Sequence, residues 1–242
     1  MHEENLLVIG ASSALGIEFL SKHGSRYTNV IAHCNSHSIE LESLARKVIF
    51  NIQIVSSDLN TEGGPQKIIN TIELSGLQID FVAFFAAPRL HIKRFHKLAW
   101  EDFQRHINVQ TRTTFQLMKY LLPSMGRRNH GKFVFVMSSV LNCSPPQGMA
   151  DYVVGKYTLL GLIKSAAVEY AGRHICINAV SPSMIDTPFI GEIPRSMVEM
   201  NAEAHPRGAN ATPAELVSIV NFLLSDAAGY ITGQNIIATG GA

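Results

Sequence analysis

The feature that most constrains the fold of this chain is a regular alternation of short apolar segments with longer amphipathic ones. The short segments are rich in Val, Ile and Phe and have the length of strands, whereas the longer ones have the spacing of helices with one apolar face. Strands are expected at Leu6–Ile9, Val30–His33, Ile52–Ser56, Phe81–Phe85, Lys132–Met137, Ile175–Val180 and Asn235–Ala238. Helices are expected at Gly16–Ser21, Ile39–Val48, Pro65–Leu74, Trp100–Met125, Tyr152–Ala171 and Pro213–Leu224.

This order of elements predicts an α/β fold in which a doubly wound, Rossmann-type parallel sheet of about seven strands is flanked by helices. Near-continuous apolar strands suit a sheet that is buried on both faces. No repeat, linker or low-complexity tract divides the sequence, so we expect residues 1–242 to form a single domain. The stretch at about 183–211 is too long for a simple connection, and we expect it to be a lid over a functional site.

The composition argues against several classes of function. A net charge of +1 and a charged fraction of 16% give no reason to expect a nucleic-acid partner. The longest apolar runs are far too short to span a bilayer, and the segment Met1–Asn5 lacks the basic region of a signal peptide. Cys34, Cys143 and Cys176 are odd in number and lack the spacing of metal ligands. We therefore expect a soluble cytoplasmic protein with no metal site and no membrane partner.

Tyr152 and Lys156 lie four residues apart in the segment D-Y-V-V-G-K. On a helix this spacing places the phenol and the ammonium on one face. A free tyrosine has a pKa of about 10, and a fixed positive charge nearby lowers it, so the pair reads as a tuned general acid/base. Ser139 lies thirteen residues upstream of the tyrosine in V-M-S-S-V. Taken alone, the pair is more often a surface tyrosine that happens to lie near a lysine.

A glycine turn follows the first expected strand and opens directly into a helix. Such a turn lets a pyrophosphate approach backbone N–H groups at the positive end of the helix. Its position at the first strand of a parallel α/β chain predicts a dinucleotide cofactor, although glycine turns join many strands to helices. The expected contacts are Gly10, Ser12, Ser13, Ala14, Leu15 and Gly16.

The end of the second strand indicates which dinucleotide binds. Folds that prefer NAD place a carboxylate here for the ribose 2′-hydroxyl, but this chain has no acid before Glu40. Asn35 and Ser36 could accommodate a 2′-phosphate, which favours NADP(H) with NAD(H) as the alternative. The same residues also suit an ordinary polar loop in which Ser38 caps the next helix. After the third strand, Asp58 and Leu59 are expected at the adenine, with a plain turn as the alternative for Asp58.

With these residues together, the chain resembles the short-chain dehydrogenase/reductases over nearly its whole length. No single motif is specific, but their order along the chain is. The matching residues are the glycine turn, Asp58-Leu59, Asn108, Ser139, Tyr152, Lys156, Asn178-Ala179-Val180-Ser181-Pro182, Thr187 and the tail from Tyr230-Ile231-Thr232-Gly233-Gln234 to Gly240-Gly241.

The resemblance implies a role for each catalytic residue. Tyr152 would exchange a proton with the substrate oxygen, and Ser139 would hydrogen-bond the same oxygen as charge develops. Lys156 would lower the pKa of the tyrosine and bind the nicotinamide ribose. Asn108 would hold a water molecule that links the lysine to solvent, although an asparagine that only satisfies helix backbone is the simpler interpretation. Ser138 is the competing serine, and the family's spacing favours Ser139.

The resemblance also implies cofactor contacts further along the chain. The backbone from Pro182 to Ile185 would face the nicotinamide carboxamide, Thr187 would hydrogen-bond it, and Ala86 would lie at the ribose. Two departures from the family pattern stand out. Ala14 replaces a glycine, and Phe84-Phe85 replaces a pair of asparagines that join neighbouring strands and line the cofactor site. The phenylalanines put both sheet packing and cofactor fit in question.

The resulting hypothesis is an NADP(H)-dependent oxidoreductase that interconverts a carbonyl and a secondary alcohol, resembling 3-oxoacyl-[acyl-carrier-protein] reductases. Two alternatives are a dehydrogenase of a sugar, steroid or other secondary alcohol, and a nucleotide-binding regulator whose chemistry has decayed. The partner would be a small-molecule carbonyl or alcohol, either free or borne on an acyl carrier protein.

The substrate pocket and the surface give further expectations. The pocket wall is expected to be apolar and to draw on Met149, Met184, Ile185, Phe189, Ile190, Ile193, Met197 and Met200. A basic run, which could dock an acidic carrier protein, consists of His91, Lys93, Arg94, His96 and Lys97. The helices Trp100–Met125 and Tyr152–Ala171 resemble those through which the family pairs subunits, so a homotetramer or homodimer is expected.

Overall fold

The computed structural model of the chain describes residues 4–36 and 38–242. Its strands form one seven-stranded sheet in the order β3-β2-β1-β4-β5-β6-β7, and every neighbouring pair is parallel. The strands are β1 (Asn5–Ile9), β2 (Asn29–Cys34), β3 (Asn51–Ser56), β4 (Phe81–Phe84), β5 (Gly131–Val136), β6 (Ile175–Pro182) and β7 (Asn235–Ala238). Because the strand order reverses between β1 and β4, the sheet is doubly wound, which confirms the predicted fold class.

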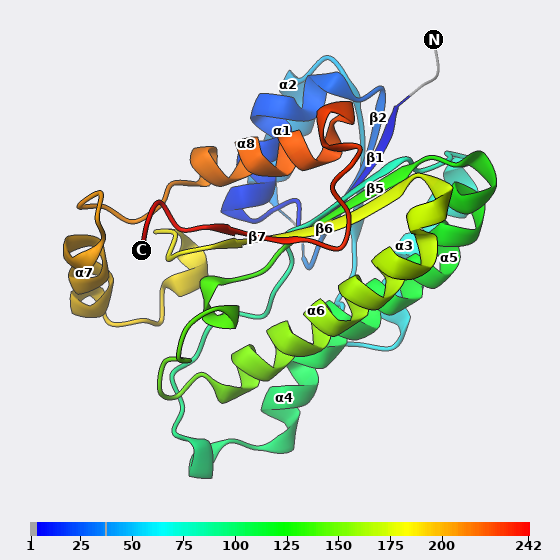
Figure 1. Cartoon of the computed structure of the whole chain (residues 1–242). Coiled ribbons are helices and arrows are strands. Elements are labelled where there is room, and N and C mark those ends of the chain that lie inside the picture. The colour runs from blue at the N-terminus through cyan, green and yellow to red at the C-terminus, as the bar shows by residue number, and fades with distance from the viewer. Residues whose placement is uncertain (1–3, 37) are drawn as a thin grey trace.

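Helices cover both faces of the sheet (Figure 1). One face carries α1 (Ala14–His23), α2 (Ile39–Lys47) and α8 (Pro213–Leu224). The opposite face carries α3 (Gly63–Ser75), α5 (Thr113–Arg128) and α6 (Ala150–Tyr170). Two further helices, α4 (Trp100–His106) and α7 (Arg195–Ala204), lie outside these layers (Figure 1). None of the helices in the described part of the chain is long and apolar enough to cross a membrane.

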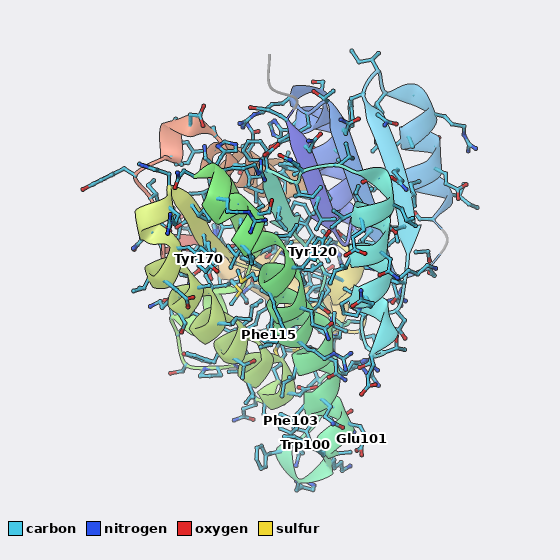
Figure 2. All side chains as sticks on the ribbon, turned by 90° about the vertical axis from the view of Figure 1, so that its right-hand side faces the viewer. Trp100, Glu101, Phe103, Phe115, Tyr120 and Tyr170 are labelled. Carbon is cyan, nitrogen blue, oxygen red and sulfur yellow. The ribbon has the colours of Figure 1, made fainter. Side chains whose placement is uncertain are left out.

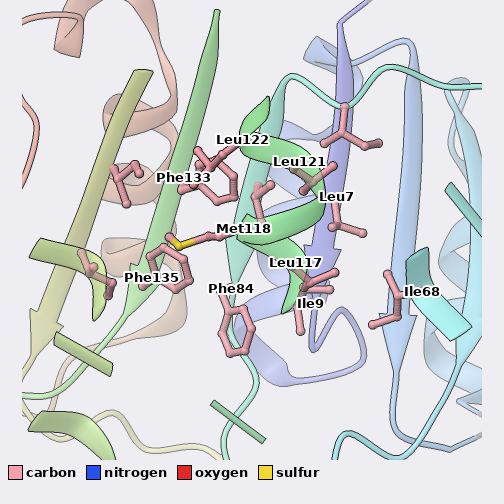
Figure 3. Packing of buried hydrophobic residues seen from close by; sticks show 14 of the residues in the cluster. Leu7, Ile9, Ile68, Phe84, Leu117, Met118, Leu121, Leu122, Phe133 and Phe135 are labelled. Atoms are coloured by element: carbon pink, nitrogen blue, oxygen red, sulfur yellow. The ribbon is translucent and has the colours of Figure 1, made fainter. Parts of the chain in front are cut away.

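Each face of the sheet has its own hydrophobic core, because successive strand residues point to opposite faces. Figure 3 shows the core under α5, where Leu117 and Leu121 lie in one cluster with Phe133 and Phe135 of β5. A second cluster lies under α1, α2 and α8. The central strands β1 and β4 are therefore buried along their whole length, whereas burial alternates along the edge strand β3.

Phe84, the last residue of β4, and Phe85, the residue after it, pack into these two cores. Phe84 is 1% exposed and packs against Phe135, with ring centroids 5.6 Å apart. Phe85 turns to the other face, where its ring centroid lies 5.6 Å from that of Phe19 on α1. The backbone N–H of Phe85 still donates to the carbonyl of Ile9, at 2.8 Å. Apolar packing of the two rings thus joins the strands, in place of the hydrogen bonds that the asparagines of the family pattern would make. Because both rings are buried in the cores, neither fills the cofactor site.

The helix predicted at Trp100–Met125 is present, but its middle part is a π-helix and not an α-helix. A six-residue π-helix, η3 (Ile107–Arg112), separates α4 from α5. In this segment the N–H of Thr113 bonds the carbonyl of Asn108, five residues earlier, and the Thr113 hydroxyl donates to the same carbonyl at 3.0 Å. π-Helical segments are rare and often lie at functional sites.

The stretch at 183–211 is more regular than the sequence suggested. It contains a 3₁₀ turn, η6 (Pro188–Ile190), and the helix α7. A parallel bridge between Ile185 and Ala211 brings the two ends of the stretch together. The sequence pattern missed α7 because the helix has only one fully buried residue, Val198, and so lacks a clear apolar stripe.

All predicted site residues lie at or beyond the carboxyl ends of the parallel strands, or on the helices that follow. Loops from β1, β2 and β3 meet on one side of the point where the strand order reverses, and loops from β4, β5 and β6 meet on the other. Ligands of open α/β sheets bind at such a point.

Candidate active site

The glycine turn after β1 is built by close backbone contacts. Gly10 has φ of +80°, and a Cβ at this position would lie 2.7 Å from the backbone nitrogen of Ala86. A Cβ at Gly16 would lie 2.6 Å from the carbonyl oxygen of Ala11. Ser13 caps α1, since its hydroxyl accepts from the N–H of Gly16 at 3.1 Å and donates to the Gly10 carbonyl at 2.7 Å. Glycine is required at both positions because any side chain would clash.

Ala14, the departure from the family pattern, is the first residue of α1 and has ordinary helical geometry. The extra methyl group therefore causes no backbone strain. Ser12 and Leu15, the remaining residues of the turn predicted to contact the cofactor, are partly exposed. The turn leads into the N-terminus of α1, a ten-residue helix, and backbone N–H groups at such a helix end can bind an anionic group.

His33, at the end of β2, is part of the scaffold. It is 1% exposed, its Nδ1 accepts from the N–H of Gly10 at 3.3 Å, and its Nε2 donates to the carbonyl of Ser57 at 2.9 Å. Burial lowers the pKa of His33 to about 4, so the ring is neutral near pH 7. Asn35 and Ser36, the residues predicted at the 2′ position, are exposed beyond it. His37 lies outside the described residues.

The loop after β3 is held by the π-helix, a contact that the sequence pattern did not reveal. The Arg112 guanidinium donates to the carbonyls of Leu59, Asn60 and Thr61 at 3.0, 3.0 and 2.7 Å. Asp58 acts as a turn former, since its carboxylate accepts from the N–H of Asn60 at 2.8 Å. Asp58 is nevertheless exposed, so this side chain can still meet a ligand. A lone arginine on a helix carries no sequence signal for such a role.

Asn108 belongs to the same contact. Its amide donates to the side-chain oxygen of Asn60 at 3.1 Å, so this group is directed at the loop after β3 and not at Lys156. Its carbonyl accepts from both the backbone and the hydroxyl of Thr113. The role that the resemblance implies for Asn108, holding a water for the lysine, therefore has no support from these contacts.

Tyr152 and Lys156 lie one turn apart on α6 and are both buried, at 5% and 2% exposure. The Lys156 ammonium donates to the carbonyl of Val136, at the end of β5, at 2.9 Å. It also lies 5.7 Å from the centroid of the Tyr152 ring. The pair predicted from sequence is thus assembled at the carboxyl edge of the sheet.

The electrostatics of the pair differ from the sequence expectation. Burial raises the pKa of Tyr152 to about 12, and this outweighs the opposite effect of a hydrogen bond with Ser138. Burial also lowers the pKa of Lys156 to about 7. The predicted lowering of the tyrosine pKa by the lysine is therefore wrong for this state of the protein. The phenol is fully protonated near neutral pH, which is the form that a proton donor needs.

The structure associates Tyr152 with Ser138, the serine that the spacing argument set aside. Ser139 begins the next turn, η4 (Ser139–Leu141), where its carbonyl accepts from the N–H of Asn142 at 2.9 Å. Both serines are partly exposed. Spacing along the sequence could not separate adjacent serines because a single step of the backbone decides which hydroxyl turns to the phenol.

The residues predicted at the nicotinamide lie at the ends of β4 and β6. Ala86 lies against Gly10, and Pro182 is the last residue of β6. Ile185 is 8% exposed, and Thr187 precedes the turn η6. The predicted contacts of this end of the cofactor thus lie at the ends of two strands on either side of β5.

An apolar cluster surrounds Tyr152 and draws on both the lid and the loop after β5. It consists of Leu90, Val140, Met149, Tyr152, Val153, Ile190, Ile193 and Val198, with Met184 and Phe189 packed against it. The Phe189 ring centroid lies 6.3 Å from that of the tyrosine. Met197 and Met200, which were expected in the pocket wall, are instead 48% and 67% exposed. Within the described residues, no group of three His, Cys, Asp or Glu side chains could hold a metal ion.

Residues 20–242 match a family model described as enoyl-(acyl carrier protein) reductase, which is one of the short-chain dehydrogenase/reductases. The chain therefore belongs to the short-chain dehydrogenase/reductase family. It is an oxidoreductase that acts on an alcohol or ketone group with a nicotinamide cofactor.

Individual relatives are more distant. The 3-oxoacyl-[acyl-carrier-protein] reductase of Aggregatibacter actinomycetemcomitans is 27% identical over 98% of both chains. A solved 4-hydroxyisoleucine dehydrogenase complexed with NADH has a TM-score of 0.89 at 24% identity and covers 99% of this chain and 98% of its own. A solved 3-oxoacyl (acyl-carrier-protein) reductase from Agrobacterium tumefaciens with NADP bound has a TM-score of 0.87 at 23% identity, over 99% and 94%. At these identities the solved structures show the fold.

Replacing Lys156 with Met is expected to stabilise the protein. Burial moves the pKa of the amine from 10.5 to about 7, which corresponds to about 5 kcal/mol at about 1.4 kcal/mol per unit. Below pH 7 the amine is charged in both states, so this cost is fully present; it is relieved as pH rises from 7 towards 10.5. Thermal unfolding at pH 6 should show a Tm at least ~5 °C above wild type for Lys156→Met, with a smaller gain at pH 9.

Lys164→Met, at an exposed position of the same helix, is the control and should change Tm little. A Tm for Lys156→Met below that of wild type at pH 6 would contradict the buried-charge explanation.

Proposed function

We propose that this chain is an NADP(H)-dependent oxidoreductase that interconverts a ketone and a secondary alcohol, with Tyr152 as the general acid/base. The observation that carries the proposal is the buried Tyr152–Lys156 pair on α6, bonded to the end of β5 and facing an apolar cluster. A protonated phenol in an apolar pocket at the ligand edge of an α/β sheet is suited to donate a proton to a carbonyl oxygen.

The turn after β1 fits a dinucleotide. Gly10 and Gly16 leave space that any Cβ would fill, and Ser13 caps α1 while the helix N-terminus stays open. Ala14 adds no strain, and the rings of Phe84 and Phe85 are buried in the cores. The departures from the family pattern are therefore compatible with cofactor binding.

The chemistry divides between the cofactor and the chain. When bound, a reduced nicotinamide would supply the hydride for the carbonyl carbon. Tyr152 donates its phenolic proton to the carbonyl oxygen, so that C=O becomes CH–OH and the phenolate is left behind. The Lys156 ammonium stabilises this phenolate, and a serine hydroxyl hydrogen-bonds the substrate oxygen as charge develops. The family's spacing assigns that serine as Ser139, whereas the contact with the phenol supports Ser138.

NADP(H) is the proposed cofactor because the loop after β2 carries no acid. Asn35 and Ser36 are exposed where the 2′ group would lie, and a carboxylate there would repel a phosphate. His33 takes no part, because both of its ring nitrogens are bonded within the scaffold. The solved relative with NADP bound and the one with NADH show that this fold accepts either.

A 3-oxoacyl group on an acyl carrier protein is the leading substrate. The full-length relative is named for this substrate, and the cluster around Tyr152 suits an acyl chain. The basic run that would dock the carrier is partly neutralised, since Lys93 pairs with Asp102 at 2.6 Å and His91 with Glu192 at 2.5 Å. Arg94, His96 and Lys97 stay exposed. A dehydrogenase of another secondary alcohol remains the alternative, since the solved relative named 4-hydroxyisoleucine dehydrogenase has the same fold.

Residues 183–211 are proposed to act as the substrate lid of a single domain. Ile190 and Ile193 of this stretch lie in one apolar cluster with Tyr152, and the Phe189 ring lies 6.3 Å from the Tyr152 ring, which places the stretch beside the phenol. We also assign the protein to the cytoplasm, where Cys34, Cys143 and Cys176 stay reduced, as they are in the structure.

Replacing Tyr152 with Phe should abolish turnover and leave cofactor binding intact, because only the transferable proton is removed. NADPH binding is measured by fluorescence titration, and turnover by NADPH oxidation with a panel of ketones, β-ketoacyl thioesters and enoyl thioesters. The rate should fall at least ~10²-fold, the size of a general-acid contribution. Tyr157→Phe, an exposed tyrosine of the same helix, should retain activity.

The panel also separates the alternatives. A wild-type protein that binds NADPH but reduces nothing would support the decayed regulator. Activity confined to enoyl thioesters would contradict the carbonyl assignment.

NADPH should bind more tightly than NADH, because no carboxylate opposes the 2′-phosphate. Dissociation constants for both cofactors are compared by the same titration at fixed salt. Asn35→Asp, which adds the missing acid, should weaken NADPH binding roughly tenfold and leave NADH binding equal or improved. Tighter binding of NADH by the wild-type protein would overturn the assignment.

The outer face of α4, α5 and α6 is proposed to pair with a second copy of the chain. Figure 2 shows the aromatic side chains that project from these helices, among them Trp100 and Phe115, which are 63% and 52% exposed. Exposed aromatic side chains on one face are typical of an interface. The family resemblance makes the partner a second copy, in a dimer or a tetramer.

Sedimentation velocity at micromolar concentration should therefore show a dimer or tetramer. Phe115→Glu, which places a charge on this face, should shift the protein towards monomer. Tyr230→Glu, at a fully exposed position elsewhere, should not change the oligomeric state. A wild-type monomer at this concentration would refute the proposal.

A further inference from the structure

A second buried polar pair lies behind the Tyr152–Lys156 pair. His106, the last residue of α4, is 2% exposed and packs edge-on against the Tyr152 ring, at 5.7 Å between centroids and 76° between planes. Gly155 makes room for it, since a Cβ there would lie 2.6 Å from the His106 Cβ. The lack of a side chain at Gly155 on α6 therefore lets His106 pack close to the helix that bears Tyr152.

The contacts of the imidazole fix its tautomer. Its Nδ1 lies 3.3 Å from the side-chain nitrogen of Gln110, which can only donate, so Nδ1 is the acceptor. The ring proton then belongs to Nε2, which faces a carboxylate oxygen of Asp151 at 3.7 Å. Burial lowers the pKa of His106 to about 4 despite the opposing effect of this carboxylate, so the imidazole is a neutral, oriented dipole.

Asp151 is an unusual residue to bury. It is 5% exposed, and its second carboxylate oxygen has no hydrogen-bond partner within the described residues. Burying a carboxylate that is only partly paired costs free energy, so its presence beside the proton donor calls for a compensating function. The charged groups around His106 are Asp151 and Lys156 on α6, Arg105 on α4 and His91 on the loop after β4.

We propose that His106 and Asp151 are positioning residues for Tyr152: the imidazole fixes the plane of the phenol, and the carboxylate orients the imidazole. The inference rests on the proposed role of Tyr152 as proton donor. The edge-on ring contact restricts rotation of the phenol. The Asp151 carboxylate oxygen that faces Nε2 at 3.7 Å holds the imidazole in this orientation.

The test combines an NMR measurement without cofactor and a double-mutant cycle. NMR of protein labelled with ¹³C at the tyrosine ring carbons next to the one that bears oxygen reports how fast the Tyr152 ring flips, and Tyr152→Phe assigns the signals. His106→Ala, which removes the ring contact, should speed the flip about fivefold or more. With the best ketone or thioester substrate, His106→Ala and Asp151→Asn should each lower kcat about tenfold, while the Kd for NADPH stays within twofold of wild type.

Because the two residues act through one contact, the double variant should be no slower than the worse single variant. Thr158→Val is the matched control, since it breaks the 2.9 Å hydrogen bond between Thr158 and Thr111 across the same helices without touching Tyr152. kcat is expressed per NADPH-binding site, so loss of folded protein does not imitate loss of catalysis.

Three results would overturn the proposal: an unchanged flip rate of the Tyr152 ring in His106→Ala, a kcat within twofold of wild type in either single variant, or a double variant about 100-fold slower than wild type. A wild-type protein without turnover refutes the proposed function instead. The ring-flip measurement, which needs no turnover, then decides the positioning role alone.

Discussion

The structure depends on a parallel sheet that is buried on both faces. Most apolar residues of the inner strands lie in one of two hydrophobic cores, so most side chains that could act on a ligand lie at the strand ends and in the loops that follow. The loops after β1 to β6 then bring glycine, serine, tyrosine and lysine together along one edge. The close backbone contact between Gly10 and Ala86 joins the two halves of this edge where the strand order reverses.

Most of this architecture could be predicted from the sequence, because strand burial and helix periodicity leave strong patterns. The seven strands, the glycine turn and the Tyr152–Lys156 pair all lie where the sequence places them. What could not be predicted depends on contacts between distant segments. Packing of the helices decides the hydrogen bonds of Arg112 to the loop after β3. It also decides in which core each of the rings of Phe84 and Phe85 is buried.

The error in the predicted pKa of Tyr152 has a different origin. Sequence spacing shows which charges are neighbours but not how deeply they are buried, and burial dominates here. It raises the pKa of Tyr152 and lowers that of Lys156, so proximity alone gave the wrong sign for the tyrosine. The same burial makes the site costly to maintain, since Lys156 and Asp151 would both be more stable in water. Conflict between stability and activity is expected at such a site.

The π-helix between α4 and α5 carries a consequence for how this chain tolerates length changes. Each residue of an α-helix advances the direction of its side chains by about 100°, and a π-segment accommodates extra residues without breaking the helix. Removing one residue from Ile107–Arg112 would let the segment relax to a continuous α-helix. If Arg112 kept its hydrogen bonds to the loop after β3, His106 would then turn about the helix axis and away from Tyr152. A single codon deletion at this point would uncouple the two ends of the site while leaving every residue that contacts a ligand in place.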